Sequence, residues 1–470
     1  NMITTAALNN AFISKALKQF QAGKELDAMM LEELLFAHSK IAERQKALYD
    51  MYTSVDLDIQ HRVLTDDVKI NNKLENDFYS LIVNQCIGYL FGNGVVYDID
   101  SDKYDSEKFK EYQNDLFKWQ IINNVADLDM ETGKYQAVCG VAYRVCYIAD
   151  GEEAVMNIKP WEVIPFEENG SMKYAIRYYK TYDANGNEIT KVDFYDEKYV
   201  SEYIYRRNAI SNESPLKLVN KYEHLFRYCP VISVANNEDH IGDFEKTMTL
   251  VEAYNRLVSD TQNEIEEFRQ AYMIFDNDAE IDKETILAAR QTGAFTLPEG
   301  SKAYFLTKDI NPEFIQLQKE MLEENIYKFS QSVNMTDENF SGGTQTGESR
   351  KWKILDLENK AIVKERKFEK ALREQFKVLC SSWNVRGKDL KYWDIHFQFS
   401  RAIPKDLSYL ADVVTKLKGI VSDRTLISLL PFTDDVDFEF EQREAELTST
   451  YGQLYNELPD TASQLPNTSN

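Results

Sequence analysis

The chain has 470 residues, 43% of them hydrophobic and 12% aromatic, which is enough for roughly two to four domains with apolar cores and excludes disorder throughout. Its 78 acidic and 54 basic side chains give a net charge of −24. This argues against tight nucleic-acid binding, because affinity for DNA comes largely from Lys and Arg replacing counterions, but it does not exclude DNA that slides past the protein.

The N-terminal part of the sequence predicts helices, followed by a sheet. Apolar residues recur at helical spacing through most of residues 10–90, which predicts helices there. The segment 71–92 is predicted to be a further helix that ends near Gly88–Gly92. Residues 135–232 are rich in Tyr, Val and Ile. Because Asx-Gly pairs supply the positive φ of tight hairpins, three such pairs predict a meander of antiparallel strands: Asp150-Gly151, Asn169-Gly170 and Asn185-Gly186.

Two long helices are predicted to flank a small insert. The segment 243–268 has an apolar stripe and no glycine or proline, so it predicts a helix of about 26 residues, roughly 40 Å long. The insert 271–310 contains the strand-like stretches "AYMIF" and "KAYFL" and a short helix around residues 286–289. Asn311-Pro312-Glu313 then predicts a helix start, and apolar residues continue in phase as far as Val333. The insert would therefore lie at the end of a stalk.

The C-terminal part is predicted to contain a loop, a third long helix and a small helical unit. Residues 336–347 form the loop and 348–382 the helix, and "WDIHFQFS" indicates a strand. A helix–Gly419–helix unit runs to Pro431, and the Ser-, Thr-, Asn- and Pro-rich end is a loose tail.

The loop contains a degenerate phosphate-binding motif. "SGGTQTGESRKWK", residues 341–353, matches G-x-x-x-x-G-K-[ST] except that Glu348 replaces the lysine. Glutamate would repel a polyphosphate, and the preceding "NMTDENF" is too polar for the buried strand that such a loop follows. We interpret the stretch as a glycine-rich loop and not as a nucleotide site, so no cofactor is expected.

The helix after the loop is basic within an acidic chain, and two interpretations stay open: a solvated face with i,i+4 pairs, or local phosphate contacts. The helix–Gly419–helix unit is predicted to be a packing domain, because acidic residues follow its second helix and few side chains could reach bases. The basic residues of the long helix are Arg350, Lys351, Lys353, Lys360, Lys364, Arg366, Lys367, Lys370, Arg373 and Lys377.

Candidate centres for chemistry are missing from the sequence. The five histidines are scattered without metal-ligand spacing, and no nucleophile or metalloprotease motif occurs, so neither a catalytic residue nor a metal site is predicted. The five cysteines form no CxxC pair and are expected to be reduced and mostly buried. The most apolar stretch, residues 80–96, is interrupted by Asn84 and Gln85, so no membrane span, signal peptide or lipid anchor is expected.

The order of these segments resembles the portal (connector) proteins of tailed double-stranded-DNA bacteriophages, of the type found in long-tailed phages of Gram-positive hosts. The resemblance covers most of residues 65–445, and the ordered set of motifs is more specific than any one of them. It rests on the Gly-Tyr-Leu-x-Gly turn in 71–98, the Gly-x-Ala-Tyr and Pro-x-x-x-x-Pro elements in 135–166, the Leu-x-x-x-Tyr-Asn pattern in 228–268, the glycine loop in 336–353, and the segment 399–431.

The resemblance implies an α+β, multi-domain, ring-forming portal fold and no enzyme activity. Residues 1–242 and 348–400 would form the wing, where 348–400 is the long tunnel helix with a returning strand. The remaining parts would be the stem helices 243–270 and 312–335, the clip 271–311, the tunnel loop 336–347, the crown 401–445 and a tail at 446–470.

The resemblance also implies a closed ring, commonly of twelve subunits, at one capsid vertex. Double-stranded DNA would pass through it without sequence-specific binding, entering during packaging and leaving during ejection. The implied partners are the terminase large subunit, a head-completion adaptor for head–tail joining, and the major capsid and scaffolding proteins, with the virion as location. An acidic bore would not grip DNA, which carries one charge per about 1.7 Å of axis.

The residues expected near DNA lie in the loop and along the stem. Three basic side chains after the loop, Arg350, Lys351 and Lys353, are candidates for weak phosphate contacts. The expected tunnel-loop residues are Asn339, Ser341, Gly342, Gly343, Thr344, Gln345, Thr346 and Gly347, and the expected channel residues of the stem are Glu252, Arg256, Asp260, Glu264 and Glu267. Two other hypotheses are a divergent nucleotide-binding enzyme that uses residues 342–349 and a monomeric scaffold or adaptor.

Overall fold

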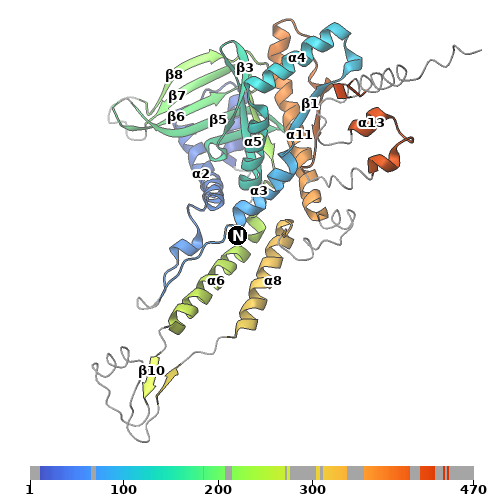
Figure 1. Ribbon diagram of the computed structural model, residues 1–470. Coiled ribbons are helices and arrows are strands. Elements are labelled where there is room, and N and C mark those ends of the chain that lie inside the picture. The colour runs from blue at the N-terminus through green and yellow to red at the C-terminus, as the bar shows by residue number, and fades with distance from the viewer. Residues whose placement is uncertain are drawn as a thin grey trace, which may run out of the picture. The chain divides into compact units, whose positions relative to one another are not determined.

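The computed structural model divides the chain into two compact units, Asn1–Ala402 and Ile403–Asn470 (Figure 1). Both contain residues that are not described, and the tunnel-loop, clip and tail predictions fall largely or wholly on them. The described residues are 11–64, 70–183, 185–206, 214–269, 272–275, 303–306, 311–335, 354–402, 413–428, 438–439 and 442–443.

The first unit is a mixed α+β structure whose largest sheet is an antiparallel meander, as the sequence predicts. At the β4–β5 turn, Asn169 and Gly170 have φ of 52° and 76°, and at the β5–β6 turn Gly186 has φ of 79°, so each Asx-Gly pair supplies positive φ. The strand order follows the chain: β4 (Val163–Glu168), β5 (Ser171–Tyr182), β6 (Glu188–Tyr195), β7 (Tyr199–Tyr205) and β8 (Leu216–Glu223).

A three-stranded antiparallel sheet packs against one face of this meander. Its order is β3 (Glu152–Ile158), β2 (Val141–Ala149), β9 (Val231–Ala235), and the β2–β3 hairpin turns at Asp150-Gly151 with φ of 50° and 83°. Val145 and Val231 from this sheet meet Tyr195 and Val200 from the larger one in a shared apolar cluster. The two sheets therefore form a sandwich.

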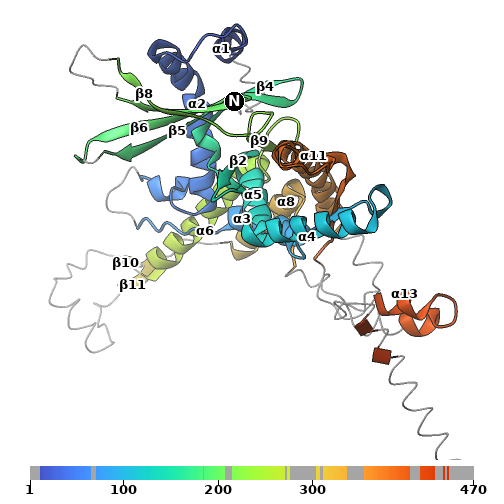
Figure 2. The ribbon, with the colours of Figure 1, turned by 90° about the horizontal axis from the view of Figure 1, so that it is seen from above.

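The opposite face of the meander is covered by α1 (Ala11–Gln21) and α2 (Ala28–Tyr52), as Figure 2 shows. Asp27 begins α2 as an N-cap whose carboxylate accepts from the Met30 amide at 2.8 Å. Leu31 and Leu34 pack on Phe166 and Phe194 of the sheet. Alternation along the strands thus gives two buried faces, one toward helices and one toward the second sheet.

The main core lies among α3 (Phe78–Phe91), α4 (Ser106–Ile122), α5 (Val125–Cys139) and α11 (Leu355–Val385). The buried guanidinium of Arg144 on β2 joins Asp129 of α5 at 2.6 Å and Gln375 of α11 at 3.0 Å. All five cysteines are buried and free, as the composition predicts.

Sequence reasoning missed the strand β1 (Val95–Ile99), which pairs antiparallel with β12 (Ile395–Phe399). The predicted strand "WDIHFQFS" is confirmed as β12, but its partner lies about 300 residues earlier and follows the apolar helix α3 directly. Pairing over such a separation leaves no local signal. The segment 100–139 also contains two helices, α4 and α5, to which the sequence analysis assigned no structure. The strand region therefore begins at Val141 and not near residue 135.

The two helices that flank the insert are α6 (Met248–Arg269) and α8 (Pro312–Ser330), which pack against each other. The predicted cap is confirmed, since Asn311 Oδ1 accepts from the Phe314 amide at 3.1 Å. The predicted bounds need correction: α6 begins after a 3-10 turn at Glu245–Thr247, and α8 ends where Gln331 takes φ of 55°, so Val333 is outside the helix. Of the insert, only the paired strands β10 (Tyr272–Phe275) and β11 (Ala303–Leu306) are described.

The described part of the second unit contains a helical segment at 413–417 and the helix α13 (Asp423–Ser428). Gly419, with φ of 86°, separates them, as the sequence predicts. Arg443 pairs with Asp423 at 3.0 Å. None of the helices in the described part of the chain combines the length and apolar character that crossing a bilayer requires.

We predict that acid destabilises the contact between α2 and the meander through His38. Its Nδ1 lies 2.9 Å from the Tyr178 hydroxyl, and full burial lowers the pKa of His38 to about 4. An unfolded histidine titrates near 6.5, so the unfolded chain binds more protons below that pH and stability falls with acidity, by about 2 kcal/mol between pH 7 and 5.

Chemical unfolding at both pH values checks this expectation. His38→Gln should flatten the pH dependence, whereas His61→Gln, at a side chain 70% exposed, should leave it unchanged. Equal slopes in wild type and His38→Gln would contradict it.

Candidate functional site

The candidate site is the place where the chain leaves α8 and returns to α11. All predicted loop residues between Asn339 and Gly347, together with Arg350, Lys351 and Lys353, lie outside the described residues, so the structure does not test their roles. It does describe both ends of this segment, residues 331–335 and 354–358. These ends show what the loop is attached to.

The first end is clamped to α3. Gln85 and Val333 exchange two hydrogen bonds of 2.8 Å: the Gln85 side-chain amide donates to the Val333 carbonyl, and the Val333 amide donates back to Oε1. Val333 is buried, and the Ser330 carbonyl at the end of α8 accepts from Lys360 Nζ at 2.9 Å. The end of α8 is therefore bonded to both α3 and α11.

The second end is held by a charged cluster around Glu358 in the first turn of α11. Arg401 donates to its two carboxylate oxygens at 2.9 and 3.0 Å, and the Tyr89 hydroxyl donates to the same carboxylate. These bonds, with that of Arg401 first, lower the pKa of Glu358. Arg401 also pairs with Glu365 at 2.6 Å, so it joins two turns of α11.

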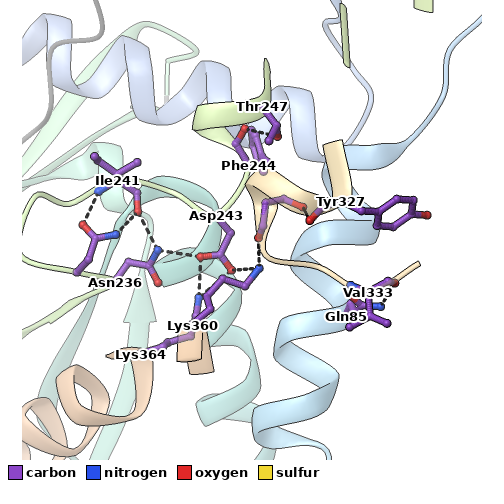
Figure 3. A network of polar contacts seen from close by, with 12 residues as sticks. Gln85, Asn236, Ile241, Asp243, Phe244, Thr247, Tyr327, Val333, Lys360 and Lys364 are labelled. Atoms are coloured by element: carbon purple, nitrogen blue, oxygen red, sulfur yellow. Dashed lines mark hydrogen bonds and ion pairs between the residues drawn. The ribbon is translucent and has the colours of Figure 1, made fainter. Parts of the chain in front are cut away.

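Between the two ends lies a buried carboxylate that two lysines share (Figure 3). Lys364 Nζ lies 3.1 Å from Asp243, Lys360 Nζ lies 3.9 Å away, and the Asn236 amide donates to Asp243 at 2.9 Å. The side chains of Asp243 and Lys364 are only 2% and 1% exposed. Burial alone raises the pKa of Asp243, but the two lysines outweigh burial and hold it below its usual value.

Asp243 lies just before α6, and its backbone is fixed against α5. Its amide donates to the Ala137 carbonyl at 2.7 Å. A Cβ on Gly140 would lie 2.0 Å from the His240 carbonyl oxygen, and one on Gly242 would lie 2.4 Å from that of Val138. Only glycine permits this close approach of two backbones. The direction of α6 is thus set by α5, and the charge of the Asp243 carboxylate is paired with lysines of α11.

A second feature covers α6 along its length. The segment 70–77, which we call the strap, runs antiparallel to the helix with alternate amides bonded to it. The amide of residue 72 donates to Asn263 at 2.7 Å, that of residue 74 to Ser259 at 3.0 Å, and that of residue 76 to Asn255 at 3.0 Å. Two extended residues advance about 6.7 Å and four helical residues about 6 Å, so the two spacings match.

The predicted channel residues of α6 lie largely beside this strap. Arg256 pairs with Asp58 at 3.0 Å, and Asp260 pairs with Arg62. Partial burial, followed by the Asp58 charge, raises the pKa of Glu252. Glu264 is half-buried and makes contacts of its own, and the side chain of Glu267 lies outside the description.

Several basic residues of α11 form ion pairs with acids of the same chain. Fewer of them are therefore available to bind phosphate. Lys360 and Lys364 serve Asp243, and Lys367 pairs with Glu238. Arg373 and Lys377 pair with acids one turn away, as the solvated-face interpretation expects. In the described part of the chain, no group of three or more His, Cys, Asp or Glu residues could hold a metal ion.

Sequence reasoning missed Gln85, Asp243 and the polar row of α6. The row had a signal: Asn255, Ser259 and Asn263 recur every fourth residue beside the apolar stripe, which is typical of a helix that binds another backbone. Asp243 had none, because a single acid among 78 is distinguished only by its surroundings.

Comparison with known proteins gives a consistent result. The family model described as "Phage portal protein, SPP1 Gp6-like" matches residues 31–451. The portal protein of Bacillus phage SPP1 is 24% identical over 463 residues, covering 93% of this chain and 89% of the relative. The portal protein of Clostridium phage phiCD119 is 23% identical over 444 residues, covering 90% and 94%.

We predict that Asp243→Asn lowers the free energy of unfolding by about 3 kcal/mol, because it leaves the Lys364 ammonium buried without a countercharge. Denaturant unfolding followed by tryptophan fluorescence measures the change. Glu238→Gln removes the exposed partner of Lys367 and should cost less than about 1 kcal/mol. Equal losses in the two variants would contradict a special role for the buried carboxylate.

Proposed function

The chain belongs to the SPP1 Gp6-like family of phage portal proteins, and from that premise we propose how its described elements serve the DNA channel. As a portal protein it is a structural, non-enzymatic component of the virion that forms the DNA channel at the capsid vertex. Packaging and connector roles follow from the family, which implies an oligomeric ring through which DNA passes.

We propose that the segments of the chain form the parts of a portal subunit that the resemblance implies. Residues 1–242 and 348–400 form the wing, α6 and α8 lie in the stem segments 243–270 and 312–335, and 271–311 is the clip. Residues 401–445 form the crown, and 446–470 are a tail. The packing of α6 on α8, with a strand pair between them in the chain, supports the stem and clip assignment.

The proposed tunnel loop, residues 336–347, contacts DNA while its ends stay fixed. Gly342, Gly343 and Gly347 suit backbone angles that other residues avoid, so the loop can follow a moving duplex. Arg350, Lys351 and Lys353 supply weak phosphate contacts. One observation carries this proposal: the first described end is bonded through Lys360 to the cluster around Asp243, and the second end is held by Arg401 and Tyr89.

This arrangement connects the loop to α6 through a continuous series of contacts. Lys360 donates to the last turn of α8 and faces Asp243, which precedes α6. A displacement of the loop end that moves Ser330 changes the position of Lys360 and therefore the field at Asp243. We propose that the loop reports DNA to α6 through this buried cluster.

For two of the predicted channel residues of α6 we propose a different role. Because Arg256 and Asp260 pair with Asp58 and Arg62, we propose that they hold the segment 58–62 against the helix and do not contact DNA. Glu252, Glu264 and Glu267 remain candidates for the channel wall.

The proposed partners are further copies of the chain in a ring of twelve, with the clip meeting the terminase large subunit and later a head-completion adaptor. The wing and crown meet the major capsid and scaffolding proteins. Negative-stain images of the purified chain should show rings with a central hole, and titration with labelled ATP should show no saturable binding. Micromolar ATP binding that Gly347→Val abolishes would overturn the non-nucleotide interpretation of the loop.

We predict that deleting residues 341–347 leaves rings intact but reduces DNA packaging or retention, because the loop loses its reach. Packaged DNA in a phage that carries the variant gene is the measurement. Replacing the same seven residues by glycine and serine keeps the length and should retain most packaging. Normal packaging by the deletion variant would remove the loop's proposed role.

We also predict a packaging defect for Lys360→Met, because the variant loses the bond to the Ser330 carbonyl while Lys364 still neutralises Asp243. Stability should fall by only about 1 kcal/mol. Arg366→Met, on the exposed face of the same helix, is the matched control and should package normally. Wild-type packaging by Lys360→Met would contradict the route from the loop to α6.

A further inference from the structure

The face of the meander that packs on the three-stranded sheet changes from apolar to charged along its length. Beyond Tyr195 and Val200, which belong to the shared apolar cluster, one residue from each of four neighbouring strands forms a polar row. The strand registers place Arg177 opposite Asp193, Asp193 opposite Glu202, and Glu202 opposite Asn220. Residues directly opposite on one face have Cβ atoms about 5 Å apart, so the row is continuous.

A cavity of about 330 Å³ lies over this row. Its acidic floor is formed by Asp193 and Glu202, and its walls include Tyr147 and Met156 from the three-stranded sheet and Leu225. Arg177, Glu223 and His224 also line the cavity, so its walls combine apolar and aromatic side chains with charged and polar ones.

The two carboxylates are placed unfavourably for the chain alone. Like charges directly opposite on adjacent strands repel. Burial raises the pKa of Asp193 to about 6, Arg177 opposes this rise, and Glu202 adds to it. The Arg177 guanidinium stacks over the Tyr179 ring at 4.7 Å and faces Glu162 at 3.7 Å, so its charge is shared with a third acid. Tyr222 hydrogen-bonds to Glu202, but no described residue forms an ion pair with Asp193 or Glu202.

A hydroxyl group in the same cavity also lacks a hydrogen-bond partner. Tyr195 is 7% exposed and lines the cavity, yet its hydroxyl has no hydrogen-bond partner among the described residues. A tyrosine hydroxyl can both donate and accept a hydrogen bond, so it is available to a polar group in the cavity. A donor or acceptor that enters the cavity would satisfy it.

We propose that this cavity binds an organic cation, an alkylammonium or guanidinium group on an apolar stem, between Asp193 and Glu202. The stem lies along the apolar walls and the cationic head lies over the paired carboxylates, as amphipathic lysine and arginine side chains do. Two carboxylates fall short of the three or more ligands that a metal site needs, and no larger group exists among the described residues. The cation comes from a lysine or arginine side chain of a partner protein or from a free polyamine.

Methyl NMR of the full-length chain, labelled at methionine methyl groups, tests the site, because Met156 lines the cavity. Nα-acetyl-lysine methylamide and putrescine are the two probes. Either probe should shift the Met156 signal in a saturable way. Tighter binding of the lysine derivative indicates a protein side chain as the source, and tighter binding of putrescine indicates a free polyamine.

The variant Asp193→Asn/Glu202→Gln should weaken binding at least tenfold while the chain stays folded, since it removes a repulsion. Glu197→Gln, at an exposed side chain on the nearby turn, is the matched control and should bind normally. Nα-acetyl-norleucine methylamide keeps the apolar stem without the charge and should not bind. The proposal is overturned if neither cation shifts Met156, if the double variant binds as tightly as wild type, or if magnesium ions alone produce the same shift.

Discussion

The arrangement of the long helices depends on one buried carboxylate. Asp243 accepts from Asn236 and faces two lysines of α11 while its backbone is bonded to α5. Taking these charges out of water is costly, so the cluster adds little to stability compared with an apolar replacement. Its value is geometric: the charges are satisfied in only one relative placement of α5, α6 and α11. The end of α8 joins the same placement through the bond from Lys360 to Ser330.

The strap extends this control along α6. Hydrogen bonds from alternate amides to a row of uncharged side chains specify the register of the strap, because a shift by one residue would turn the bonded amides away from the helix. The ion pair of Arg256 with Asp58 is exposed and that of Asp260 with Arg62 is partly exposed, so each contributes little by itself. Together they pair two charges of α6 with the chain's own segment 58–62. The helix therefore presents fewer free charges to its surroundings than its sequence suggests.

The sequence was sufficient for features with a local cause. Asx-Gly turns predicted the meander, Asn311 predicted the start of α8, and the order of motifs identified the family. Features that depend on distant partners were missed or misplaced. β1 pairs with a strand about 300 residues away, and the helix predicted from 243 begins at Met248 because Gly242 and Asp243 are held against α5. Lys360 and Lys364 were grouped with surface bases because burial cannot be read from a charge count.

These observations separate two requirements of a DNA channel, namely fixed attachment and weak contact. The described anchors meet the first, because Val333 and Glu358 are each bonded to elements of the main core. Under the role proposed for the loop, the sequence between them would meet the second through glycine, which has no side chain to hold a duplex, and through few basic residues. Five basic side chains elsewhere on α11 are engaged by Asp243, Glu238 and neighbouring acids, which makes them less available to DNA phosphates. In a protein of net charge −24, this internal pairing of bases agrees with the proposal that DNA meets weak attraction at the loop.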